Sequence, residues 1–260
     1  MDPQDLQERL SRISTLWTMV FQAHAGPPDA IADAQRLLMQ RYSGAVLRYL
    51  LGALHDPDVA DDLAQEFAYR FVRGDFRRAN PDRGRFRDYL KTALIHLVTD
   101  YHNARQTAPR LLAPDASEPA APLLESMDSE RAFQGSWREE LLDRTWKALA
   151  DANPTYHAAL LLRVENPDLQ SAQMAERLTA RLGKPMSAAL VRKSLQRAHV
   201  KFADFLLDEV AGSLESAAED ELENELRELD LLRYCRTALE RRCRKESKGG
   251  ANLSRNPPTT

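Results

Sequence analysis

The stretch from Asp56 to Arg105 constrains the fold most strongly, because apolar residues recur in its first part at a helical spacing. They lie one helical turn apart, at Val59, Leu63, Phe67 and Phe71. This spacing puts their side chains on one face of an α-helix, and that face has to be buried against another element. The sequence therefore predicts a helix that Asp56 caps and that stops at Gly74, where a left-handed residue is permitted.

A second helix is predicted from about Gly84 to Arg105, with a basic segment before it. Its apolar face holds Phe86, Leu90, Ala93, Leu94, Leu97 and Tyr101, and its opposite face holds Tyr89, Thr92, His96, Thr99 and Asn103. Side chains of the second kind donate to or accept from base edges. From Arg70 to Lys91 the chain has eight basic residues against three aspartates, so this segment carries a local positive charge.

The first helix also has a polar face, opposite its apolar stripe. This face consists of Asp58, Asp61, Asp62 and Gln65, with Glu66 at its edge. An acidic face close to a basic segment would hold a basic protein on one side and nucleic acid on the other. The alternative is a solvated charged surface on an ordinary helical core, and the charge pattern alone favours neither interpretation.

The segments DVADDLAQEF and RGRFRDYLKTALIHLVTDY resemble the core domain of sigma-70 family RNA polymerase sigma factors, of the small extracytoplasmic-function (ECF) type. The resemblance covers about residues 12 to 105. In that family the acidic helix docks on the clamp helices of the largest polymerase subunit. The resemblance therefore implies polymerase binding by Asp58, Asp61, Asp62, Gln65 and Glu66.

The same resemblance implies contacts with the minus-ten promoter element. In the family, the loop after the acidic helix captures a flipped base, and this loop corresponds to residues 77 to 85 here, with Asn80 at the centre. The helix that follows touches the DNA. The residues implied are Arg77, Arg78, Asn80, Arg83, Arg85, Tyr89, Thr92, His96, Thr99 and Asn103.

The rest of the chain predicts an all-α protein with two helical domains joined by a flexible linker. A core domain is expected over residues 1–105 and a Pro-bearing, mainly acidic linker over 106–135, because four prolines there prevent a continuous helix. A helix-turn-helix domain is expected over 136–212. Ser136 is a candidate cap for its first helix. A helical extension that changes from acidic to basic follows over 213–246, and a disordered tail over 247–260.

The helix-turn-helix prediction depends on two helices joined by a short turn at Gly183, with Ser187 capping the second. The outer face of that second helix carries Arg192, Lys193, Gln196 and Arg197. Arg and Gln read base edges, and Lys meets phosphate, although solvated helices often carry basic residues as well. The segment SAALVRKSLQRAHVKF resembles the sigma recognition helix. The resemblance implies minus-thirty-five contacts by Ser187, Arg192, Lys193, Gln196 and Arg197.

Composition and motifs argue against an enzyme or a metalloprotein. The chain has no Gly-rich phosphate loop, GxSxG, HExxH or CxxC motif, and its six histidines are scattered. Cys235 and Cys243 have no histidine at ligand spacing, so a reduced pair is expected. No signal peptide or membrane span is recognised, and a cytoplasmic protein is expected. The net charge of −3 means that DNA contacts come from local patches.

These observations predict an ECF-type sigma factor that binds core RNA polymerase and promoter DNA and directs transcription initiation without a cofactor. An anti-sigma factor is a candidate regulatory partner. One alternative is a helix-turn-helix regulator that acts without polymerase, whose mark is tight DNA binding by the isolated chain. Another is a sigma-like interaction module without DNA function, which would keep partner binding when Lys193 and Arg197 are replaced.

Overall fold

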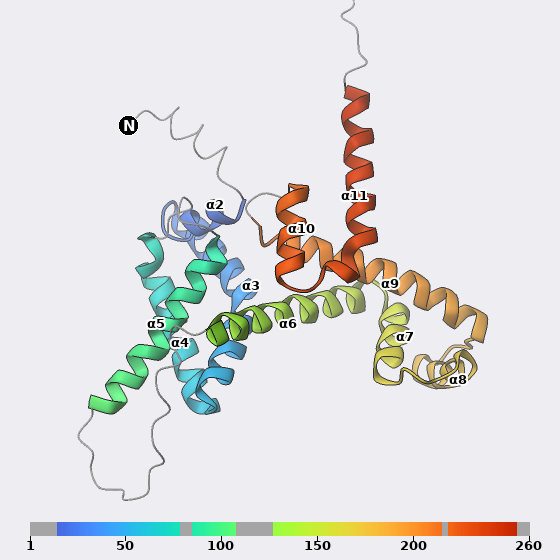
Figure 1. Cartoon of the computed structure of the whole chain (residues 1–260), viewed down its shortest axis with the longest axis horizontal. Helices are drawn as coiled ribbons and strands as arrows, with labels where there is room; N and C mark the ends of the chain where they lie inside the picture. The colour runs from blue at the N-terminus through green and yellow to red at the C-terminus, as the bar shows by residue number, and fades with distance from the viewer. Residues whose placement is uncertain (1–14, 79–84, 108–126, 215–217, 254–260) are drawn as a thin grey trace, which may run out of the picture. The chain divides into compact units, whose positions relative to one another are not determined.

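The structure, a computed structural model, describes residues 15–78, 85–107, 127–214 and 218–253. These residues form helices and turns with no strand among them, which confirms the all-α prediction (Figure 1). The elements are α2 (Thr15–Gln22), α3 (Pro28–Leu54), α4 (Pro57–Arg73), the 3-10 helix η1 (Asp75–Arg78), α5 (Phe86–Thr107), α6 (Met127–Ala152), α7 (Pro154–Glu165), α8 (Ser171–Leu182), α9 (Ala188–Ala211), α10 (Glu219–Glu228) and α11 (Leu232–Leu253).

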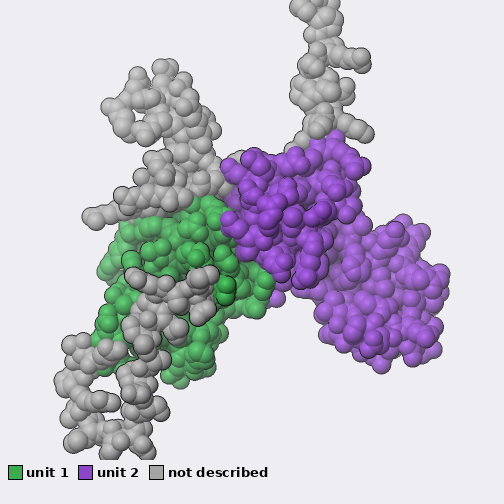
Figure 2. Space-filling model, in the orientation of Figure 1, with its two compact units in different colours: residues 1–140 green, residues 141–260 purple. Residues whose placement is uncertain are grey.

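Two compact units make up the chain, residues 1–140 and 141–260, and the division falls inside α6 (Figure 2). The helix begins at Met127, so the end of the segment expected as a linker is helical, whereas residues 108–126 lie outside the described ranges. The predicted cap at Ser136 is wrong. Its hydroxyl donates a hydrogen bond to the Ala132 carbonyl within α6, at 3.0 Å.

In the first unit, helices α4 and α5 form as their apolar patterns predict. Asp56 accepts hydrogen bonds from the backbone N–H groups of Asp58 and Val59, which confirms it as the cap of α4. Gly74 ends that helix in the left-handed conformation with φ of 95°. Past it, Phe76 in η1 packs edge-on against Phe67, with ring centroids 5.3 Å apart, so the chain folds back onto the buried face of α4.

The first half of α6 belongs to the core of this unit. Trp137 is fully buried and stacks on Tyr42 of α3, with ring centroids 5.1 Å apart. The buried carboxylate of Glu140 accepts a 2.5 Å hydrogen bond from Arg48, also on α3. A Cβ atom at Gly44 would lie 1.9 Å from Glu140 Oε2, so the absence of a side chain at this position leaves room for the Glu140 carboxylate.

In the second unit, α7, α8 and α9 pack around Leu162, Met174, Leu178 and Val191, with a short turn between α8 and α9. Gly183 ends α8 with φ of 64°, and the Ser187 side chain caps α9 by accepting the Leu190 N–H at 3.2 Å. Both residues thus delimit the turn as the sequence predicts.

The C-terminal extension packs on the second half of α9. Arg241 of α11 donates to Asp204 at 2.7 Å, and the apolar side of the extension buries Cys235, whose pKa burial raises to about 12. Such a thiol stays protonated and unreactive at neutral pH. Helix α11 continues to Leu253, into the segment from residue 247 that was expected to be disordered. That expectation stays a prediction, and 254–260 lie outside the described ranges.

Replacement of Trp137 tests whether the start of α6 is a core element. We expect Trp137→Ala to lower the free energy of unfolding by about 3–5 kcal/mol, because a large aromatic side chain leaves a cavity against Tyr42. Urea denaturation followed by circular dichroism measures the loss. Arg131→Ala, an exposed position on the same helix, is the control and should change the value by less than about 0.5 kcal/mol. A loss below about 1 kcal/mol for Trp137→Ala would contradict the assignment.

Candidate functional site

The polar side of α4 is exposed, and we call its residues the acidic face: Asp58, Asp61, Asp62, Gln65 and Glu66. The first four are exposed and Glu66 is half-buried, because Ala60, Phe67 and Phe71 turn the opposite side of the helix into the core. Asp61 accepts a hydrogen bond from Gln65 at 2.8 Å. Within the described ranges, the carboxylates of Asp58 and Asp62 have no side-chain partner. The fold therefore leaves these negative charges open to solvent.

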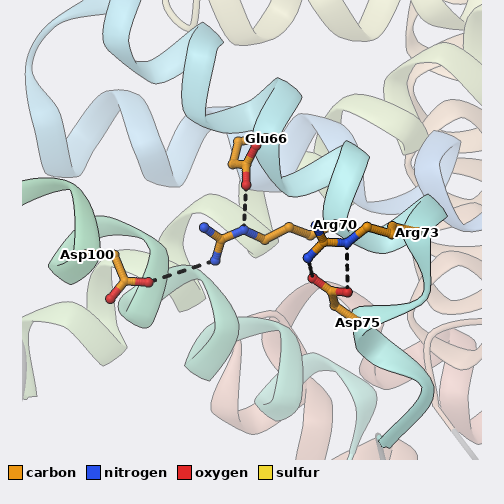
Figure 3. A network of polar contacts seen from close by, with 5 residues as sticks. All are labelled: Glu66, Arg70, Arg73, Asp75 and Asp100. Carbon is orange, nitrogen blue, oxygen red and sulfur yellow. Dashed lines mark hydrogen bonds and ion pairs between the residues drawn. The ribbon is translucent and has the colours of Figure 1, made fainter. Parts of the chain in front are cut away.

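Glu66 differs from the rest of the acidic face because an arginine holds it. Arg70 Nε donates to Glu66 at 2.7 Å, and the same guanidinium lies 3.8 Å from Asp100 on α5 (Figure 3). Arg70 thus bridges α4 and α5 and compensates the Glu66 charge. The spacing of four residues between Glu66 and Arg70 favours such a pair on a helix, but Asp100 becomes a partner only through the packing of two helices.

A second arginine–aspartate pair secures the end of α4. Arg73 donates to both carboxylate oxygens of Asp75, at 3.1 and 2.5 Å (Figure 3). This hydrogen bond lowers the pKa of Asp75 below its ordinary value. The pair joins the last turn of α4 to η1 and so fixes where the chain leaves toward the basic segment.

Only part of the expected minus-ten surface can be placed. Asn80 and Arg83 lie outside the described residues, and η1 contains Arg77 and Arg78, whose side chains are not described. The half-buried Arg85 pairs with Asp88 at 3.3 Å, at the start of α5. The basic segment therefore enters α5 with one of its arginines held in place.

Helix α5 brings the remaining candidates to one side. Thr92, His96 and Asn103 are exposed and Thr99 is half-buried. The hydroxyls of Thr92 and Thr99 donate to backbone carbonyls one turn earlier, at 3.0 and 2.7 Å, which leaves their oxygens as acceptors. Side chains that accept and donate are thus spaced along this side of α5.

Tyr89 belongs to an aromatic cluster rather than to the open side of α5. Its ring packs edge-on against Phe76, with centroids 5.7 Å apart, and burial raises the pKa of its phenol. On the other side of Phe76, a cavity of about 190 Å³ is lined by Phe21, His24 and Ala25 of the α2 region. The sequence pattern predicted neither the cluster nor the cavity, because the cluster depends on how η1 packs against α5 and the cavity on how the α2 region meets η1.

The outer face of α9 is exposed as expected. Arg192, Lys193, Gln196 and Arg197 are all exposed, and no other described side chain pairs with them. Leu190 and Val200 are also exposed on this helix, at 43% and 39%. Ser187 acts first as the cap, although its hydroxyl proton remains available to an acceptor. The arrangement offers guanidinium, amide and apolar groups, which are the groups that read base edges.

Within the described ranges, no three His, Cys, Asp or Glu side chains are placed to bind a metal ion. None of the helices in those ranges is both long enough and apolar enough to cross a lipid bilayer. These are observations on the described residues alone.

A comparison with protein families finds a match to the family model described as Sigma-70 region 2, over residues 38–107. No curated protein and no solved structure matches the chain significantly. The matched residues include most of α3 and all of α4, η1 and α5, so the acidic face, the Arg70 bridge and the outer side of α5 lie inside them. Over these residues the chain is similar to region 2 of the RNA polymerase sigma-70 family, and this similarity supports a role in transcription initiation.

Proposed function

We propose that the protein is an ECF-type sigma factor that binds core RNA polymerase and directs promoter-specific transcription initiation. The observation that carries the proposal is the exposure of the acidic face inside the Sigma-70 region 2 match. A fold that buried Asp61 and Asp62 would leave no surface for the polymerase. Here the apolar side of α4 is buried instead.

The proposed polymerase contact is electrostatic at Asp58, Asp61 and Asp62, whose charges no described basic side chain neutralises. Opposite charges on two partners speed their encounter and select among partners. Glu66 contributes less to this contact, because Arg70 already holds its carboxylate. Glu66 instead helps to orient α4, because the Arg70 that it binds also contacts Asp100 on α5.

The proposed minus-ten contact uses the side of α5 formed by Thr92, His96, Thr99 and Asn103, together with the basic residues 77–85. Basic groups track a phosphate backbone, and aromatic or apolar recesses accept unstacked bases. Strand opening costs a few kcal/mol for each unstacked base, which base capture and polymerase binding offset. Neither ATP nor a metal ion is part of the proposal.

The proposed minus-thirty-five contact uses the outer face of α9, with Ser187 and Arg192, Lys193, Gln196 and Arg197. A chain with a net charge of −3 has little general attraction for DNA, so promoter binding needs the polymerase. Promoters lie in the cytoplasm of a bacterial cell, and this location belongs to the proposal. An anti-sigma factor that covers the acidic face is the proposed mode of control.

The unpaired face of α9 also supports a second candidate function, a helix-turn-helix regulator that binds DNA without polymerase. The two functions differ in what the isolated chain does. Run-off transcription with purified core enzyme and genomic promoter fragments tests the first. Nanomolar, sequence-specific binding by the isolated chain, without stimulation of transcription, would favour the second.

Charge reversal on α4 tests the polymerase contact. We expect the double variant Asp61→Lys/Asp62→Lys to lose more than about tenfold in affinity for core polymerase, or about 1.4 kcal/mol, because repulsion replaces attraction. Co-purification and run-off transcription measure the loss, and circular dichroism verifies the helix content. The matched control is Glu165→Lys/Asp168→Lys, which reverses two exposed carboxylates in the second unit. Undiminished co-purification of the α4 variant would exclude the docking assignment.

Replacement of Gln196 tests base reading by α9. A glutamine amide pairs in a bidentate manner with adenine, so we expect Gln196→Ala to weaken binding of the holoenzyme to its selected promoter by about 1–3 kcal/mol. The loss should disappear when the base pair of the minus-thirty-five element that Gln196 reads is changed. Competition binding against a promoter library provides the measurement. An equal loss on every sequence would show that Gln196 does not read a base.

A further inference from the structure

A cavity in the second unit lies beside the outer face of α9. Its volume is about 310 Å³, and its walls come from the start of α7, the turn between α8 and α9, and the first half of α9. Three of its lining residues are basic: Lys184 from the turn, and Lys193 and Arg197 from α9. Three separate elements therefore contribute to one recess.

The positive charge of this cavity is not neutralised by its own walls, because no carboxylate lines it. Lys184 donates a 2.7 Å hydrogen bond to the hydroxyl of Thr155, which is a neutral partner. Lys193 and Arg197 have no side-chain partner among the described residues. Basic groups drawn together without counter-charges create a potential that attracts an anion.

The start of α7 adds to this potential. Asn153 caps the helix by accepting the Tyr156 N–H at 2.9 Å, and Thr155 stands in the first turn, where backbone N–H groups lack helical acceptors. The positive end of a helix favours a negative group. Both Asn153 and Thr155 line the cavity, so this helix end is part of its wall.

Ser194 adds a hydroxyl donor to the wall of the cavity. It lies on α9 with only 4% of its surface exposed, and it lines the same cavity. Within the described ranges its hydroxyl makes no hydrogen bond. Its oxygen is not among the fully buried atoms that lack a partner, so it is accessible from the cavity and can donate to a molecule there. An oxygen atom of an anion in the cavity would accept this hydrogen bond.

We propose that this cavity is an anion site that holds a phosphate group, with Lys184, Lys193 and Arg197 supplying charge and Ser194 a hydroxyl donor. The phosphate belongs either to the backbone of bound DNA or to a free phosphorylated molecule. Binding of a DNA phosphate rests on the proposed promoter binding, whereas the existence of the anion site is independent of it. The site divides the face of α9: Lys193 and Arg197 hold phosphate, and Arg192 and Gln196 are left to read bases.

The first arm of the test uses the free full-length chain with inorganic pyrophosphate, against sodium chloride at equal ionic strength. We expect pyrophosphate to shift the backbone amide resonances of Thr155 and Ser194 and to raise the midpoint of thermal unfolding. Lys184→Met, which keeps the aliphatic part of the side chain, and Ser194→Ala should each weaken binding at least threefold. Lys201→Met, an exposed lysine of α9 outside the cavity, should bind as the wild type does.

The second arm measures promoter binding by the holoenzyme across a range of salt concentrations. One lost phosphate contact lowers the slope of log K against log salt by about 1, equally for all sequences. We expect this for Lys184→Met and no change for Lys201→Met. Circular dichroism verifies that each variant is folded.

A change in the salt slope assigns the site to the DNA backbone. Pyrophosphate binding that Lys184→Met weakens, with an unchanged salt slope, assigns it to a free phosphorylated molecule. If neither arm responds to Lys184→Met and Ser194→Ala, the anion site is refuted. If the wild-type holoenzyme binds no promoter, the proposed function is refuted. The pyrophosphate measurements would then still show whether the anion site exists.

Discussion

The burial of one side of α4 determines which charges this protein offers to a partner. Phe67 and Phe71 are inserted between α3, η1 and α5, and no rotation of the helix keeps both buried while it hides Asp61 or Asp62. The position of the acidic face is therefore a consequence of core packing rather than of charge. Arg70 adds to this constraint by bridging Glu66 and Asp100, which ties the rotation of α4 to α5. The proposed polymerase contact depends on this constraint.

In α9, too, the burial of the apolar side of the helix determines which side chains face the solvent. Val191, Ala198 and Leu206 are fully buried, and Ser187 sets the start of the helix, so the basic and amide side chains are directed to solvent. The extension α10–α11 packs on the second half of α9 and holds Asp204 through Arg241. A helix secured along its rear can present a fixed set of groups to a rigid duplex, because little freedom is lost on binding.

The predictions from sequence succeeded where short-range chemistry decides the structure. The cap at Asp56, the stops at Gly74 and Gly183 and the burial of Phe67 and Phe71 follow from residues within a few turns. The start of α6 could not be predicted in this way, because this part of the helix is stabilised by the packing of Trp137 on Tyr42, which is far away in the sequence. The anion cavity likewise brings together Thr155, Lys184 and Ser194 from three different elements. A local sequence pattern does not predict contacts of this kind.

The contact between Gly44, Arg48 and Glu140 has a consequence for how related chains evolve. The carboxylate of Glu140 occupies the space that a side chain at position 44 would need, and it is a counter-ion of Arg48, 92 positions away. A lineage that acquired alanine at 44 would have to move or shorten the side chain at 140, and Arg48 would then keep Glu139, 4.0 Å away, as a carboxylate neighbour on α6. We therefore expect exchanges at position 44 to be accompanied by changes at 140. Their joint variation would mark descendants that repacked this helix pair.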